Sequence, residues 1–506
     1  MKTRYLPSYC YRTVVFIGLI ILCWSKDVFA SPALTAALNQ HMAHPFFQES
    51  DVGIQVVNAN TKEEVFSYNS EVHLIPASVM KSLTAAVALQ ELGTEYRFVT
   101  DIRYTGEINE EGVLKGNLYV VGGGDPYMDG EGLWKLIRDM KMEGINSIHG
   151  GIYFDDTRYD GASFIPGWGK EVDLANGPSY FPMRSSLSLN TNNVAIHVRP
   201  GNRIGTKAKV FLEYPYSIVE IDNQVKTSSP GSNSWMSVER EVIFEDETQQ
   251  VTEGQHQNVE KIIYHFTGRI PITVQNDWVY YRSILEPERF FKENFLEILT
   301  QHGVGHRGRS GFQQAPDNAQ TLVSYRSEPL RLLIADMNKY SRNLTAEAII
   351  LEMAAQRSLP ATTAQGLASV ESYLERLGVW SEGTVLYNGS GLSPSMQLQA
   401  SQVSAVMLDM FDNQLVGPEY YTSLAVAGRD GTLRRRLQEE QYNSRARGKT
   451  GSINGVYCLA TYVLGGDGNT YVVVFFVNNL RRQTSFVRQM QNQFLQTIVD
   501  VPNNNF

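Results

Sequence analysis

The chain has 506 residues, of which 42% are hydrophobic and 19% charged, a composition typical of a globular protein of about two to four domains. Its net charge of −9, without any block of like charges, excludes an electrostatic basis for nucleic-acid binding. The nine histidines are scattered and no His-Glu-x-x-His pattern occurs, so the sequence indicates no metal site.

The N-terminus has the layout of a secretory signal peptide. Basic residues precede an apolar run at 14–24, and Val28-Phe29-Ala30 supplies the short side chains expected before a cleavage site. We expect residues 1–30 to be removed and the protein to reach a periplasm. The run is shorter than the about 20 residues of a membrane span. A lipoprotein signal with Cys23 as acceptor and an uncleaved anchor stay open.

Beyond the signal peptide the only cysteine is Cys458, so no internal disulfide is available. Export without disulfides suits a bacterial periplasmic protein with a large core. Cys458 lies in an alternating apolar pattern, which predicts a buried strand residue and not a nucleophile.

The first third of the chain alternates between helical and strand patterns. A helix is predicted at 33–43, a hairpin at 53–69, and a second helix from Pro76 to Gly93. The next predicted elements are strands at 96–106 and 116–126, a helix at 131–144 and a strand at 147–156.

The middle of the chain, from about 200 to 312, is rich in short strands and polar turns and favours an all-β module that ends in a helix at 285–302. The last third returns to the earlier pattern. It predicts helices at 343–356 and 366–378, a hairpin at 455–479 and a closing helix at 483–500. The simplest interpretation is one domain interrupted by a long insertion.

Ser78 and Lys81 are polar exceptions on the opening turn of an otherwise apolar helix. Residues three apart share a helix face, so the hydroxyl and the amine are neighbours. Serine becomes a nucleophile when a nearby base takes its proton, and lysine can serve once burial or a second cation lowers its pKa. This Ser-x-x-Lys is unique in the chain, although an ordinary serine beside a surface lysine is the simpler interpretation of the motif alone.

Two further motifs lie downstream. Lys449-Thr450-Gly451 opens a strand, where a cation and a hydroxyl could hold a carboxylate and the glycine would let a substrate approach the backbone. Ser-x-Asn occurs four times, so the motif alone carries little weight. The copy formed by Ser341 and Asn343 is favoured, because it leads into a helix and lies between the other two motifs in chain order.

The order Ser-x-x-Lys, Ser-x-Asn, Lys-Thr-Gly resembles the signature of penicillin-binding proteins and serine β-lactamases. Flanking segments such as GGGDP, PGWG, SSLSLNTNN, NGSGLS and AGRDGTLRRRL resemble the D-alanyl-D-alanine carboxypeptidase/endopeptidase family, the low-molecular-mass class C penicillin-binding proteins. The resemblance extends over nearly the whole mature chain. The long separation of Ser78 and Ser341 also matches this family, which carries two extra domains there.

The resemblance implies an α+β fold with a β-lactamase/transpeptidase-like serine acyltransferase domain, an antiparallel sheet flanked by helices, interrupted by two strand-rich domains. We expect the catalytic domain to comprise 31–101 and 313–506. One inserted β-rich domain would comprise 102–127 and 190–312, and a second, small α/β domain would comprise 128–189.

The resemblance also implies the catalytic roles. Ser78 would attack the carbonyl between two D-alanines, and Lys81 would take its proton. Ser341 would relay a proton to the leaving amine, and Asn343 would hold the substrate amide and Lys81 in place.

The resemblance assigns substrate binding to the strand that begins at Lys449. Lys449 would lower the pKa of its neighbours and attract the terminal carboxylate, with Thr450 hydrogen-bonded to it and Gly451 beside it. The backbone N–H groups of Ser78 and Ser452 would form the oxyanion hole.

The implied partners are peptidoglycan peptide stems and β-lactam antibiotics, which would acylate Ser78, with no cofactor, metal or nucleic acid. A loose association with the membrane, the oligomeric state and the balance of carboxypeptidase and endopeptidase activity stay open. A penicillin-binding scaffold with little turnover and a β-lactamase or esterase on the same fold are the alternatives, and the long insertion argues against a β-lactamase.

Three positions depart from the family pattern, and a fourth is a separate candidate for substrate binding. Arg342 replaces the acidic or amide residue usual in the middle of Ser-x-Asn, and we expect it to point away from the serine. Asn388 stands where the family often has Asp, and Pro394 where a basic residue is common, which puts the pocket for the donor side chain in doubt. Asp156 is a candidate partner for a stem amino group, although a solvated carboxylate at a strand end is the simpler interpretation.

Overall fold

The computed structural model describes residues 32–502 except for 163, 167, 169–176, 246–257 and 481–483. The predicted signal peptide lies outside the described residues. Within these ranges no helix combines the length and the apolar character that crossing a membrane requires.

A six-stranded antiparallel sheet, in the order β19-β20-β21-β22-β1-β2, forms the centre of the main domain. Its strands are β1 (Asp51–Asn58), β2 (Glu64–Tyr68), β19 (Ala425–Val426), β20 (Ala446–Ile453), β21 (Val456–Leu464) and β22 (Thr470–Asn478). The two predicted hairpins are confirmed as β1–β2 and β21–β22. β1 also pairs along its whole length with β22, so the start and the end of the chain meet in one sheet.

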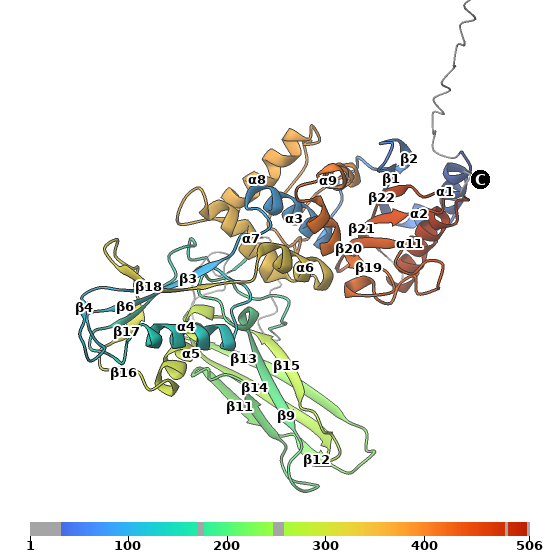
Figure 1. The fold of residues 1–506 in the computed structure, drawn as a ribbon. Helices are drawn as coiled ribbons and strands as arrows, with labels where there is room; N and C mark the ends of the chain where they lie inside the picture. The colour runs from blue at the N-terminus through green and yellow to red at the C-terminus, as the bar shows by residue number, and fades with distance from the viewer. Residues whose placement is uncertain are drawn as a thin grey trace, which may run out of the picture.

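Helices cover both faces of this sheet (Figure 1). One layer contains α1 (Pro32–His41), α2 (Phe46–Glu49) and α11 (Thr484–Val499). The other contains α3 (Met80–Glu91), α6 (Leu330–Tyr340), α7 (Asn343–Ala355), α8 (Thr363–Arg376), α9 (Ala400–Asp412) and α10 (Gly417–Ser423). Successive strand side chains point to opposite faces, so Cys458 joins the core beneath α3 while Leu459 joins the core beneath α11. This two-sided burial explains why β21 and β22 are apolar at nearly every position.

The first part of the insertion is built on a five-stranded sheet in the order β17-β8-β6-β3-β18. Its strands are β3 (Val99–Tyr104), β6 (Leu118–Val121), β8 (Ile152–Asp155), β17 (Ser310–Phe312) and β18 (Gln320–Arg326). Beside it lie a small sheet and two helices, namely β4 (Glu107–Ile108), β5 (Val113–Lys115), β7 (Ser147–Ile148), β16 (Gly305–His306), α4 (Gly130–Met142) and α5 (Pro287–Gln301).

The second part of the insertion projects away from the main sheet as a strand-rich arm (Figure 1). One of its sheets contains β9 (Asn193–Arg199), β10 (Lys209–Leu212) and β15 (Trp278–Ser283). The other contains β11 (Val219–Asn223), β12 (Lys226–Ser228), β13 (Trp235–Phe244) and β14 (Val259–Pro271). Short 3₁₀ turns complete the described elements, namely η1 (Ala77–Val79), η2 (Asn190–Asn192) and η3 (Gly431–Leu433).

Strand pairing crosses the domain boundaries that the sequence predicts. β6 pairs in parallel with β8, and β3 pairs antiparallel with β18, so one sheet joins segments assigned to three different domains. A single hydrophobic cluster also runs from α4 and α5 into the strands of the arm. We therefore propose dividing the insertion by sheet membership. Local periodicity cannot reveal pairing between segments that lie far apart in the chain.

Candidate active site

Ser78 and Lys81 lie where η1 runs into α3. The helix is rich in alanine and leucine, and all ten residues from Met80 to Leu89 are buried. The spacing of three residues places Lys81 Nζ 2.9 Å from Ser78 Oγ. Ser78 itself stays partly exposed and accessible. The structure therefore presents a hydroxyl at the surface with an amine directly beneath it.

Lys81 is fully buried and makes two further hydrogen bonds. Its Nζ donates to Asn343 Oδ1 at 2.7 Å and to the carbonyl of Ser390 at 2.6 Å. Burial, and then the charge of Lys449, hold the pKa of Lys81 well below its usual value, against the opposing effect of Glu347. A neutral amine has two hydrogens for these two acceptors and one lone pair left for the hydroxyl of Ser78. The site can therefore remove the serine proton.

Ser341 and Lys449 meet on the other side. Ser341 is the left-handed residue, with φ 60° and ψ 44°, that ends α6 just before α7. Lys449 on β20 donates from Nζ to Ser341 Oγ at 3.0 Å and to the carbonyl of Thr450 at 2.7 Å. Burial lowers the pKa of Lys449 to about 7. This lysine can therefore change its charge near neutral pH.

β20 lies against the turn that carries Ser78. A Cβ atom at Gly451 would lie 2.6 Å from the carbonyl oxygen of Pro76 and 3.0 Å from the Ser78 nitrogen, so only glycine permits this approach. β19 pairs only with Arg447 and Gly448 on this edge of β20. In the described part of the chain, the edge from Lys449 to Ser452 pairs with no other strand, which leaves Thr450 half-buried and Ser452 exposed. Such an edge can accept an extended peptide as an added strand.

Three residues without a role in the sequence analysis support Lys81, namely Glu347, Ser390 and Gly391. Glu347 is buried and accepts the backbone N–H groups of Gly389, at 3.1 Å, and Ser390, at 2.8 Å. This contact holds the loop that presents the Ser390 carbonyl to Lys81. A Cβ atom at Gly391, where φ is +75°, would lie 1.9 Å from the carbonyl oxygen of Ala77. An acidic residue inside an apolar helix, four positions after Asn343, was the available signal for Glu347.

The insertion reaches the site at two points. Asn343 Nδ2 donates to the carbonyl of Tyr180 at 2.7 Å, and Asn388 Nδ2 donates to the carbonyl of Pro166 at 2.9 Å. The Oδ1 atom of Asn388 accepts the Gly391 N–H at 2.8 Å. The asparagine at 388 therefore ties the loop beneath Lys81 to the inserted segment.

Arg342 and Asp156 both make contacts outside this cluster. Arg342 forms an ion pair with Asp336 at 3.1 Å. Asp156 Oδ1 accepts hydrogen bonds from Ser185 Oγ and from the backbone N–H groups of Ser186 and Leu187. Asp156 thus holds a loop together. Among the described residues, no group of three His, Cys, Asp or Glu side chains could hold a metal ion.

The structure thus brings the five motif residues together from segments far apart in the chain. Hydrogen bonds join Lys81 to Ser78 and Asn343, and Lys449 to Ser341, while the charge of Lys449 acts on Lys81. Known proteins are similar to this chain in sequence and in fold. A sequence model of the D-Ala-D-Ala carboxypeptidase 3 (S13) family matches residues 34–498. The D-alanyl-D-alanine carboxypeptidase of an Actinomadura species is 28% identical over 475 residues, covering 89% of this chain and 84% of the relative.

A protein sequence and a crystal structure from Haemophilus influenzae are also similar to this chain. Its D-alanyl-D-alanine carboxypeptidase DacB is 26% identical over 436 residues, 85% of each chain. The crystal structure of its penicillin binding protein 4 has a TM-score of 0.73 at 22% identity, covering 91% of this chain and 97% of that chain. The predicted fold class is confirmed. The chain belongs to the D-Ala-D-Ala carboxypeptidase 3 (S13) family of hydrolases, as the resemblance of its motifs implied.

Proposed function

We propose that this protein is a serine DD-peptidase that hydrolyses D-alanyl-D-alanine ends and D-alanyl-diaminopimelate cross-links of peptidoglycan through an acyl-enzyme on Ser78. The observation that carries the proposal is the contact between Ser78 Oγ and the buried Lys81 amine. A bacterial periplasm, reached through the signal peptide at 1–30, is the proposed location. The family and its relatives support the carboxypeptidase part.

Acylation begins when Ser78 Oγ attacks the carbonyl carbon and its proton passes to the neutral Lys81. The new Oγ–C bond forms as the C–N bond to the leaving D-amino acid breaks, and the proton that Lys81 has taken passes through Ser341 to the leaving amine. The hydrogen bond from Lys449 Nζ to Ser341 Oγ supports this relay. Water then releases the acyl group and restores the hydroxyl of Ser78.

Substrate binding uses the open edge of β20. Lys449, when charged, attracts the terminal carboxylate, and the hydroxyl of Thr450 donates a hydrogen bond to it. The backbone N–H groups of Ser78 and Ser452 stabilise the oxyanion, and loss of one such donor typically costs about 10²–10³ in turnover. The glycine at 451 lets the strand and the Ser78 turn lie close enough for both donors to reach one oxygen.

Covalent labelling tests the nucleophile. We expect fluorescent penicillin to form a stable adduct that mass spectrometry locates on Ser78, and Ser78→Ala to abolish the label. Ser82→Ala, which removes a buried hydroxyl bonded to the Val79 carbonyl on the same helix, is the matched control and keeps the label. Rapid loss of label with destruction of the drug would indicate a β-lactamase, and no adduct would indicate a scaffold.

Muropeptides separate the two peptidase activities. Release of D-alanine from a monomeric pentapeptide reports carboxypeptidase activity, and conversion of a cross-linked dimer into monomers reports endopeptidase activity. We expect both, and we expect both to be lost in Ser78→Ala. A dimer that stays intact while D-alanine is released would remove the endopeptidase part of the proposal.

The two lysines predict an acidic and an alkaline limb in the dependence of kcat/KM on pH. The rate rises with pH through the lowered pKa of Lys81, because only the neutral amine can take the serine proton. It falls above about pH 7, the pKa of Lys449, because the neutral form no longer attracts the substrate carboxylate. A substrate whose terminal carboxylate is replaced by an amide should lack the alkaline limb. An identical limb for both substrates would contradict the role of Lys449.

A further inference from the structure

A cavity of about 940 Å³ lies between the insertion and the main domain. On the insertion side it is lined by Phe154 at β8, Phe312 at β17 and Glu288 on α5. On the other side it is lined by Leu359 and Pro360, from the loop between α7 and α8. Its volume is within the range of sites that bind small organic molecules.

This cavity is distinct from the site at Ser78. Tyr159, which lines it, packs against Leu351 and Ala354 in the C-terminal half of α7. Asn343 begins the same helix at the Ser78 site. At a rise of about 1.5 Å per residue, the eleven positions from Asn343 to Ala354 separate the two places by roughly 16 Å along the helix axis.

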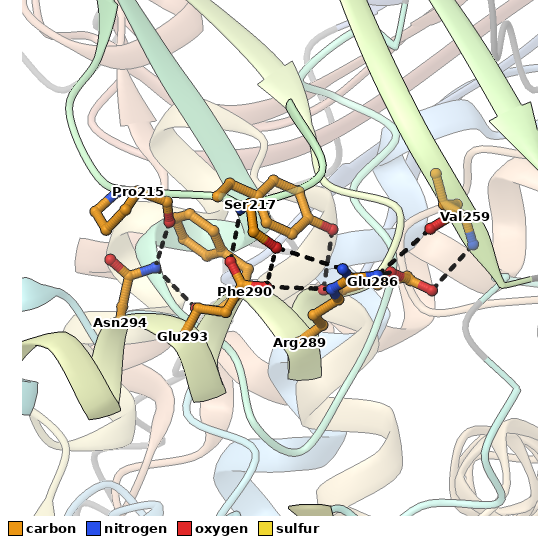
Figure 2. A network of polar contacts seen from close by, with 9 residues as sticks. Pro215, Ser217, Val259, Glu286, Arg289, Phe290, Glu293 and Asn294 are labelled. Atoms are coloured by element: carbon orange, nitrogen blue, oxygen red, sulfur yellow. Dashed lines mark hydrogen bonds and ion pairs between the residues drawn. The ribbon is translucent and has the colours of Figure 1, made fainter. Parts of the chain in front are cut away.

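Glu288 is the unusual group in the cavity wall. Its Oε2 atom is buried and has no hydrogen-bond partner among the described residues. The other acidic residues at this end of α5 are partnered, as Figure 2 shows: Glu286 binds Arg289 at 3.2 Å, and Glu293 accepts from Ser217 Oγ at 2.6 Å. A buried carboxylate oxygen without a partner is destabilising. The fold therefore maintains an acceptor here that it does not itself satisfy.

The cationic residues around the cavity are already engaged. Arg103 pairs with Asp101 at 2.8 Å, and Arg158 pairs with Glu352 at 2.5 Å. Lys292, one turn after Glu288 on α5, places its Nζ over the ring of Phe312. None of these is within ion-pair distance of Glu288.

The cavity wall carries more carboxylates than unpaired cationic side chains. Asp155, Asp156, Asp160 and Asp317 also line the cavity, and of these Asp160 pairs with Arg184 at 2.8 Å. Burial, and then the nearby charge of Asp156, raise the pKa of Glu288 to about 8. A bound ammonium group would oppose both effects and favour the ionised carboxylate. Both arginines of the cavity wall are already paired with other carboxylates, so an added cation beside Glu288 would be stabilised.

We propose that this cavity binds an organic cation, a primary amine or diamine, with the Glu288 carboxylate as its counter-ion. An organic cation fits better than a metal ion, because no group of three metal-binding side chains occurs among the described residues. Phe154, Phe312 and Leu359 supply apolar contacts for a hydrocarbon chain beside the charge. The ligand would bridge the insertion and the main domain, away from the proposed acylation chemistry.

Calorimetric titration of the full mature chain with 1,5-diaminopentane tests this proposal. We expect saturable binding to the unsubstituted protein, and no binding of the neutral analogue 1,5-pentanediol. Glu288→Gln should weaken diamine binding at least about tenfold. Glu297→Gln, which neutralises an exposed acid on the same helix, should leave it unchanged. The readout is independent of peptidase activity, so failure here and failure of the proposed function are distinguishable.

A second variant covers the case in which Glu288→Gln fails to fold. Leu359 is 60% exposed at the cavity wall, so Leu359→Trp can narrow the cavity without altering a buried contact, and it should also weaken diamine binding. Absence of saturable binding to the unsubstituted protein would overturn the proposal. Equal binding by the folded variants, or equal binding of the diol, would overturn it as well.

Discussion

Replacing Lys81 by methionine should slow acylation of Ser78 by about 10²–10⁴-fold, the range that a positioned general base contributes. Methionine has similar length, so the core around α3 keeps its volume. It has no lone-pair nitrogen to take the serine proton, and it leaves Asn343 Oδ1 and the Ser390 carbonyl without their donor. Stopped-flow measurement of the acylation rate with a chromogenic cephalosporin gives the size of the effect.

A measurement of the free energy of unfolding distinguishes loss of the general base from loss of the fold. Burial disfavours the charged form of Lys81, so methionine removes that cost and should not lower the free energy of unfolding by more than about 1–2 kcal/mol. Lys135→Met, on the exposed face of α4, is the matched control and should acylate at the unsubstituted rate. Acylation of the Lys81 variant within a few-fold of normal would exclude this lysine as the base.

Replacing Gly391 by alanine should both destabilise the protein and suppress acylation. The new Cβ atom would lie 1.9 Å from the Ala77 carbonyl oxygen and 2.9 Å from Met80 Cβ, at a φ of +75°. The left-handed conformation costs a non-glycine residue about 1–2 kcal/mol, and overpacking adds about 1–3 kcal/mol. The turn that carries Ser78 must move to relieve the contact. Urea unfolding and penicillin labelling measure the two effects.

Gly378 offers a matched control for this substitution. It follows α8 with φ +71°, and no atom lies within 4 Å of the position that a Cβ would occupy. Gly378→Ala should therefore show only the conformational cost of about 1–2 kcal/mol, with normal labelling of Ser78. Equal losses of stability and labelling in the two variants would mean that contact with the Ala77 turn does not position the nucleophile.

Sequence patterns predicted several helices and strands of the main domain well, because these elements have strong local signals. The α3 helix and the β21–β22 hairpin are apolar runs that end at turn residues, and the closing helix is amphipathic. The pairing of strands within the insertion was harder to predict from the sequence. β8 lies between β6 and β17 in parallel pairings, and neither pairing leaves a trace in the local sequence.

The motif residues at 78, 81, 341, 343 and 449 were candidates from the sequence because their types and order resemble a known signature. Their support could not be inferred in the same way. Glu347 holds a loop 42 positions away through backbone N–H groups, which every residue type offers equally. Gly391 is needed only because Ala77 passes beside it. Neither requirement can be recognised without the tertiary structure.

The amino-acid order alone determined which groups can react: two hydroxyls, two amines and an amide at characteristic spacings. Tertiary structure decided their state. Burial of Lys81 and Lys449 in one core lowers both pKa values, because a charged amine loses its hydration there. Reactivity at this site therefore depends on desolvation, a property of the packed molecule that no single segment possesses.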